Sequence, residues 1–152
     1  MASIESQIFA SMKTILEELS WPKYVEYERI RQKLGDFRPH EIPAIQIYDG
    51  SATYARLQGR SDMTWFLIVE VVMKKTQDDL VDQGLLFDRL NEVETKIGEN
   101  PQLGLTSLPA TEGTMVSIVP IARATDLHME DVFYTGNLSF QAEYLKPYSD
   151  IC

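Results

Sequence analysis

The stretch EIPAIQIYDG, residues 41–50, decides the fold that we expect for this chain. Pro43 favours extended backbone at the residue before it, and Asp49-Gly50 is a dipeptide typical of tight turns. The apolar residues between them predict a short buried strand over residues 43–48. Because an Asp-Gly turn reverses the chain, we expect residues 52–57 to pair back with that strand as a hairpin.

Two amphipathic helices are predicted around the strands. The first follows Ser3, a suitable N-cap, and ends before Trp21-Pro22. The second begins at Asp78 and Asp79 and stops at Gly98. Their apolar stripes are formed by Ile4, Ile8, Met12, Ile15 and Leu19 in the first helix, and by Leu86, Leu90, Val93 and Ile97 in the second.

Further strands are indicated on both sides of the second helix. Residues 64–74 are apolar on both faces except at Glu70, a pattern typical of a central strand. A carboxylate in such a strand costs free energy unless it is paired, near an edge or at an interface. Residues 24–30 read as an edge strand. Residues 115–125 form a strand that is bulged or at an edge because of Pro120. Residues 126–136 read as a loop, and residues 138–144 alternate as a last strand.

The order of these elements predicts an α+β fold. We expect one domain over residues 1–152, with an antiparallel or mixed sheet of four to six strands and the two helices packed on one face. The expected core contains Ile8, Met12, Ile15, Leu67, Val69, Val71, Leu86, Leu90, Val93 and Phe140.

Composition excludes several classes of function. The net charge of −9 argues against general nucleic-acid binding, which rests on Lys and Arg contacts to phosphate. No apolar run approaches the ~18 residues of a membrane span, and the spaced apolar residues of the first helix do not fit a secretory signal. Cys152 is the single cysteine, so no disulfide within the chain is expected, and a cytosolic or cytosol-assembled protein is the default expectation.

Groups for catalysis are few. His128, Glu130 and Asp131 lie close in sequence, but zinc needs three or four ligands and His40 is the only other histidine. A solvated acidic loop is the favoured interpretation of residues 128–131. There is no phosphate-binding glycine loop and no Gly-x-Ser-x-Gly motif. We therefore predict no catalytic, cofactor or metal site and no enzymatic activity.

Four cations lie within ten residues in an otherwise acidic chain, and we call Arg29, Arg31, Lys33 and Arg38 the basic segment. It is either a solvated hairpin tip or a docking segment for an acidic surface on a neighbouring subunit. Phe37 and Phe133 lie in polar surroundings, as interface anchors often do.

The whole pattern resembles the tail terminator, or tail completion, proteins of long-tailed bacteriophages. The resemblance rests on an N-terminal helix, a charged segment with Arg29 and Arg31, the strand of residues 41–48 and the long apolar strand of residues 65–73. The helix from Asp78 and two polar strands, residues 115–125 and 138–145, complete it. It covers nearly the whole chain.

This resemblance implies an α/β protein without catalytic residues that forms a homo-hexameric ring on the head-proximal end of the tail tube. Its partners would be the tail tube protein, a head-closure or neck protein and, in addition, the sheath protein, within the virion neck. DNA could pass through the ring, with no specific binding and no membrane contact. The expected interface joins unlike charges head to tail and contains Arg29, Arg31, Lys33, Phe37, Arg38, Asp126, Glu130, Asp131 and Phe133.

Three alternatives remain from the sequence. The same resemblance allows a neck or head-closure adaptor. A small-ligand-binding α+β domain would need a concave apolar pocket with a few polar groups. A metal-dependent hydrolase would have to be built on His128, Glu130 and Asp131.

Overall fold

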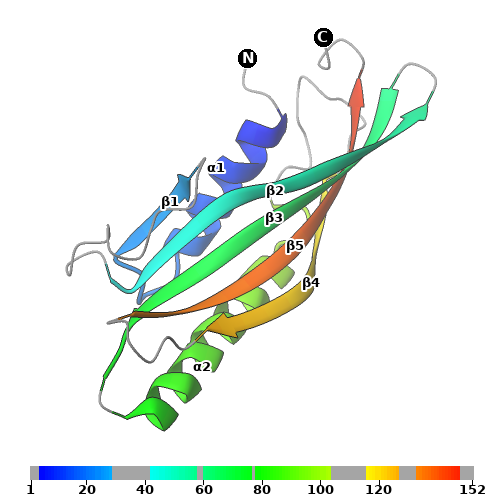
Figure 1. Ribbon diagram of the computed structural model, residues 1–152. Helices are drawn as coiled ribbons and strands as arrows, with labels where there is room; N and C mark the ends of the chain where they lie inside the picture. Colours follow the sequence, from blue (N-terminus) through cyan, green and yellow to red (C-terminus); the bar gives the residue numbers. More distant parts are fainter. Residues whose placement is uncertain are drawn as a thin grey trace.

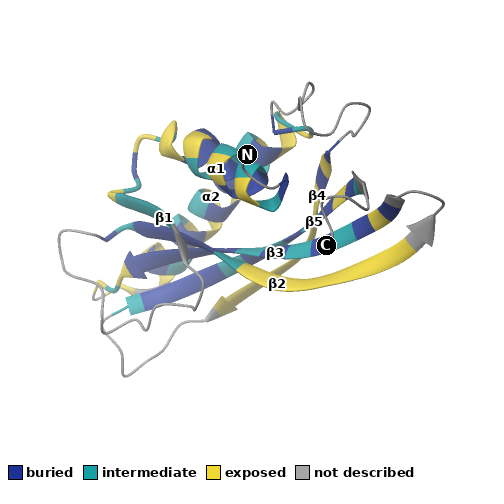
Figure 2. Ribbon diagram, turned by 90° about the horizontal axis from the view of Figure 1, so that it is seen from above, coloured by how far each residue is buried: buried dark blue, intermediate teal, exposed yellow. Residues whose placement is uncertain are grey.

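The computed structural model describes residues 4–28, 42–57, 60–76, 78–103, 116–126 and 133–147. It has a five-stranded mixed sheet in the order β1-β2-β3-β5-β4, with both helices on one face (Figures 1 and 2). This confirms the predicted α+β arrangement. The elements in chain order are α1 (Ile4–Glu17), β1 (Tyr24–Glu28), β2 (Ala44–Leu57), β3 (Arg60–Lys74), α2 (Asp79–Gly98), β4 (Ser117–Asp126) and β5 (Phe133–Pro147).

Both helices form where their stripes predict them. In α1, Ile4, Ile8, Met12 and Ile15 are buried, and Leu19 packs against the same core from beyond the end of the helix. Helix α2 is capped by Asp78, whose Oδ1 accepts hydrogen bonds from the backbone N–H groups of Leu80 and Val81 at 3.1 and 3.2 Å. Such a cap stabilises a helix by about 1 kcal/mol. The four predicted stripe residues of α2 are fully buried.

The Asp49-Gly50 turn is a wrong prediction. Strand β2 continues through this dipeptide and pairs antiparallel with β3 along its length, so residues 52–57 pair with Arg60–Trp65 and not with residues 43–48. The ladder shifts by one residue between Asp49 and Ala52, as in a β-bulge. A Cβ on Gly50 would lie 2.6 Å from the carbonyl oxygen of Phe66. Glycine therefore allows the two backbones to approach at the bulge, where the sequence indicated a turn.

Strand β3 is the centre of the sheet, as predicted. Its odd-numbered residues from Met63 to Met73 are buried under the helices. Glu70 faces the other side and is fully buried, and its carboxylate accepts a hydrogen bond from the side-chain amide of Gln46, its cross-strand neighbour. A hydrogen-bond partner of this kind is what a carboxylate buried within a central strand needs, because burying it without one costs free energy.

The edge strands also follow the sequence. Strand β1 lies at one edge and pairs with β2 in parallel, and β4 lies at the other edge with a register shift between Pro120 and Ala122. The predicted loop over residues 126–136 is too long, because β4 includes Asp126 and β5 begins at Phe133. Burial of Tyr134 against the core extends the strand across residues that look polar in the sequence.

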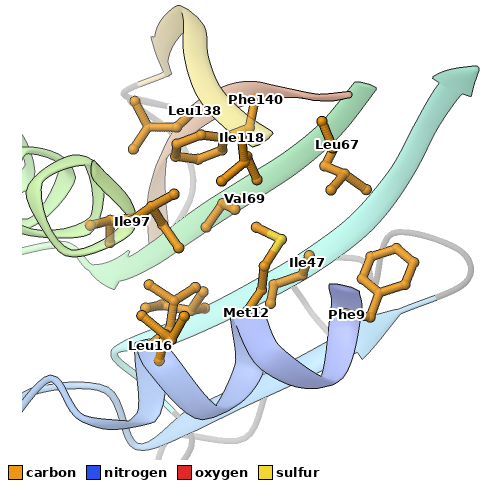
Figure 3. Packing of buried hydrophobic residues seen from close by; sticks show 14 of the residues in the cluster. Phe9, Met12, Leu16, Ile47, Leu67, Val69, Ile97, Ile118, Leu138 and Phe140 are labelled. Carbon is orange, nitrogen blue, oxygen red and sulfur yellow. The ribbon is translucent and has the colours of Figure 1, made fainter. Parts of the chain in front are cut away.

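The hydrophobic core lies between the helices and the sheet, and all ten predicted core residues belong to it. Figure 3 shows Met12 and Leu16 of α1, Ile97 of α2 and side chains from all the longer strands meeting there. A second, smaller cluster of Ile42, Ala44 and Val72, with Tyr24 and Phe133 packed against it, involves the opposite face of the sheet.

Candidate functional site

Most of the predicted interface lies outside the described residues and stays a prediction. This holds for Arg29, Arg31, Lys33, Phe37, Arg38, Glu130 and Asp131. His128, which the alternative metal site would need, also lies outside the described residues. Asp126 is the last residue of edge strand β4. Phe133 was predicted to be a loop aromatic, but it is the first residue of β5 and packs against the smaller cluster, so the loop placement is wrong. Its role at an interface stays a prediction.

A cleft lies between α1 and the part of the sheet that extends beyond it. This α1 cleft has a volume of about 570 Å³, and the residues that line it include Glu5, Phe9, Lys13, Asp49, Tyr54 and Trp65. Figure 2 shows the exposed part of β2, in yellow, extending past the helices. Because neither α1 nor α2 covers β2 there, Tyr54, on the helix side of the sheet, is 65% exposed.

The floor of the cleft is aromatic and fixed. The rings of Phe9 and Trp65 meet edge to face, with centroids 4.9 Å apart and an interplanar angle of 87°. The indole Nε1–H of Trp65 donates a hydrogen bond to Asp49 Oδ1 at 2.6 Å. The bulge at Gly50 follows directly after Asp49, so the residue that looked like part of a turn instead holds the Trp65 ring.

The rim of the cleft carries charged groups. Lys13 Nζ lies 3.0 Å from Glu26 Oε2 of β1, and hydrogen bonding to this carboxylate raises the pKa of Lys13. Burial, and then the charge of the Glu5 carboxylate, raises the pKa of the Tyr144 hydroxyl. Since both groups stay protonated at neutral pH, they can donate hydrogen bonds but cannot act as a general base there.

Sequence reasoning missed this cleft, although one signal was present. Glu5, Phe9 and Lys13 recur every four residues and thus share a side of α1 next to the predicted stripe. The spacing alone did not indicate a cleft, because its opposite wall is built by β2 and β3. Residues 52–57 of β2 were predicted to pair with residues 43–48 and not with β3.

The face of the sheet away from the helices and edge strand β4 form a second candidate surface. Phe66 and Ile68 are half-buried on that face, and Val119 and Ile121 of β4 are 47% and 48% exposed. Pro120 stands between these two residues at the bulge, where it removes a backbone donor. The row of backbone N–H groups along this edge is interrupted at Pro120. A partner would therefore meet exposed apolar side chains there.

In the described ranges, no group of three or more His, Cys, Asp and Glu side chains is placed to hold a metal ion. Within the same part of the chain, no helix is both long and apolar enough to cross a membrane.

No protein-family model matches the chain, and no curated protein matches its sequence.

Proposed function

We propose that this chain is a structural protein of a long-tailed phage virion. It forms a ring at the head-proximal end of the tail tube, ends tube polymerisation and offers the surface that joins the head or neck. The proposal starts from the resemblance in the sequence. The order of helices and strands on which that resemblance rests is the order found in the fold, apart from the extended β2.

The observation that carries the proposal is the open sheet with two unlike edges. A ring is closed by heterologous contacts, in which one surface of a subunit meets a different surface of the next. Strand β1 lies at one edge and β4 at the other, and no described strand pairs with the outer side of either. Exposed Val119 and Ile121 on β4 are apolar groups that a neighbouring subunit could cover.

The charge of the chain is compatible with a ring around DNA. With a net charge of −9 per subunit, a ring would repel phosphate across a Debye length of about 8 Å at physiological salt. Passing DNA would then not adhere to the channel wall.

Electron microscopy of the purified protein with uncapped tail tubes tests this function. We expect a ring on one end of each tube and no further tube growth when tube protein is added. Tubes that stay bare at saturating protein, or that are decorated along their sides, would refute it. A ring that joins two neck components without capping the tube would favour the neck or head-closure adaptor.

The α1 cleft favours a second candidate, a small-ligand-binding domain. A concave site with an aromatic floor and a few polar groups is the usual form of a ligand pocket. Ligand-observed NMR with a set of small organic cations would test it, and saturable binding by a protein that neither caps tubes nor self-associates would favour it over the ring.

A further inference from the structure

We propose that two copies of this chain associate by pairing β2 with β2 about a two-fold axis. The contact uses residues 49–57 of β2, the part of the strand that continues past β1, which we call the open edge. The contact is independent of the proposed tail function, because it leaves edge strand β4 free.

The first argument is that the open edge has no neighbouring strand. Strand β1 pairs with β2 only from Ala44 to Tyr48, and beyond Tyr48 no described strand pairs with the outer side of β2. Figure 1 shows β2 running on past the end of β1. The residues from Asp49 to Ala55 are all exposed, so neither α1 nor α2 covers this edge. The open edge is longer than a typical strand of about five or six residues, and it therefore offers a full row of backbone groups to a second strand.

The second argument is that the open edge lacks the features that keep other edges from pairing. Natural edge strands are usually protected by charged side chains, by proline or by bulges. Residues 50–55, GSATYA, contain no charge and no proline, and the ladder to β3 is regular from Ala52 to Leu57. Edge strand β4, in contrast, has Pro120 and a register shift in its middle. Backbone pairing with a second copy is therefore favoured at β2.

The third argument is that the open edge is complementary to itself. A two-fold axis perpendicular to the sheet makes β2 antiparallel to its copy, and residues that pair must point to the same side of the sheet. Ala52 and Tyr54 point toward the helices and Thr53 away from them, judged by their partners in β3. Even-numbered residues must then pair with even-numbered ones, so one residue at the axis pairs with its own copy. Thr53 is the middle residue of the open edge, and threonine pairs of this kind are favourable.

This register also gives the exposed Tyr54 ring a contact. Tyr54 is 65% exposed in the single subunit, and it lines the α1 cleft together with Ala52. In the pair, Tyr54 is the cross-strand neighbour of the second copy's Ala52, on the helix side of the sheet. Each ring then covers apolar surface at the mouth of the other copy's cleft.

The pairing of Thr53 with its own copy permits a test by charge reversal. In Thr53→Lys two ammonium groups would face each other across the axis, and in Thr53→Glu two carboxylates would do so, whereas a mixture of the variants pairs opposite charges. Thr53 is exposed, so both changes leave the core intact. Thr95→Lys and Thr95→Glu, at an exposed threonine of α2, are the matched controls. Circular dichroism and thermal unfolding check that each variant is folded.

Sedimentation velocity of the full chain gives the first result. We expect the wild type and both controls to form dimers alike, and each Thr53 variant alone to associate at least about tenfold more weakly. An equimolar mixture of the two Thr53 variants should regain the association of the wild type. A wild type that is monomeric at every concentration, a Thr53→Lys variant that associates like Thr95→Lys, or a mixture that does not regain association would each overturn the inference.

Hydrogen exchange of the wild-type protein locates the contact. Backbone amides of residues 51–55 that point outward should exchange more slowly as the protein concentration rises, because the second copy accepts their hydrogen bonds. A dimer in which these amides exchange at a rate independent of concentration would be held together elsewhere and would contradict the β2 contact. Neither experiment involves tail tubes, so failure of the contact and failure of the proposed function are observed separately.

Discussion

At the scale of single residues, Gly50 and Gly84 are a contrasting pair of glycines. A Cβ at position 50 would meet a backbone carbonyl oxygen at 2.6 Å, whereas a Cβ at position 84 in α2 would meet nothing within 4 Å. We expect Gly50→Ala to lower the free energy of unfolding by about 1–3 kcal/mol because the backbone of the bulge must shift. Gly84→Ala should raise it by about 0.5–1 kcal/mol through helix propensity. Urea unfolding of both variants measures the difference, and equal effects would contradict the bulge.

Tyr134 predicts how stability depends on alkaline pH. Burial raises its pKa from 10.0 to about 12. Because the folded pKa lies above the unfolded one, this contribution to stability is complete below pH 10 and is lost as the pH rises from 10 toward 12. Tyr134→Phe should therefore flatten the fall in unfolding free energy over this range. Chemical denaturation of both proteins at several alkaline pH values measures the difference, and pH curves of equal slope would contradict the burial of the Tyr134 hydroxyl.

At the scale of elements, the apolar stripe of α2 holds the helix to the sheet. Leu90 is fully buried, and its methyl groups lie next to Gly136 of β5. We expect Leu90→Ala to lower the free energy of unfolding by about 2–5 kcal/mol, measured by chemical denaturation. Leu80→Ala on the same helix should change it little, since Leu80 is 79% exposed in the subunit. A small effect at Leu90 would mean that α2 is not packed on the sheet as described.

The elements also show how far sequence reasoning reaches. The stripes of α1 and α2 and the apolar β3 are local patterns, so their positions and their core residues could be read directly. The Asp49-Gly50 dipeptide has the same local signal in a turn and in a bulge, and only its pairing with residues 65–67 of β3 distinguishes the two. Parallel pairing of β1 with β2 and the α1 cleft depend on contacts between distant segments, which no local pattern encodes.

At the scale of the whole molecule, edge strand β4 predicts an assembly defect without a folding defect. Val119→Lys with Ile121→Lys places charges on exposed side chains of the β4 edge. The variant subunit should unfold like the wild type but fail to form rings on tail tubes, because buried charges at an interface are costly unless they are paired. Leu80→Lys with Val81→Lys, at two exposed apolar residues of α2, is the matched control. Normal capping by the double variant would exclude β4 from the subunit contact.

The bulge at Gly50 also changes which residues of β2 share a side of the sheet. Before it, odd-numbered Ile45 and Ile47 point toward the helices, and after it even-numbered Ala52 and Tyr54 do so, judged by their partners in β3. Removing one residue here would leave a regular strand in which Tyr54 keeps its partner Met63 and its side of the sheet, without the local kink of the bulge. The close approach of residue 50 to the backbone of Phe66 would go with the bulge. Related chains that are one residue shorter between Ile47 and Tyr54 should therefore also lack the glycine.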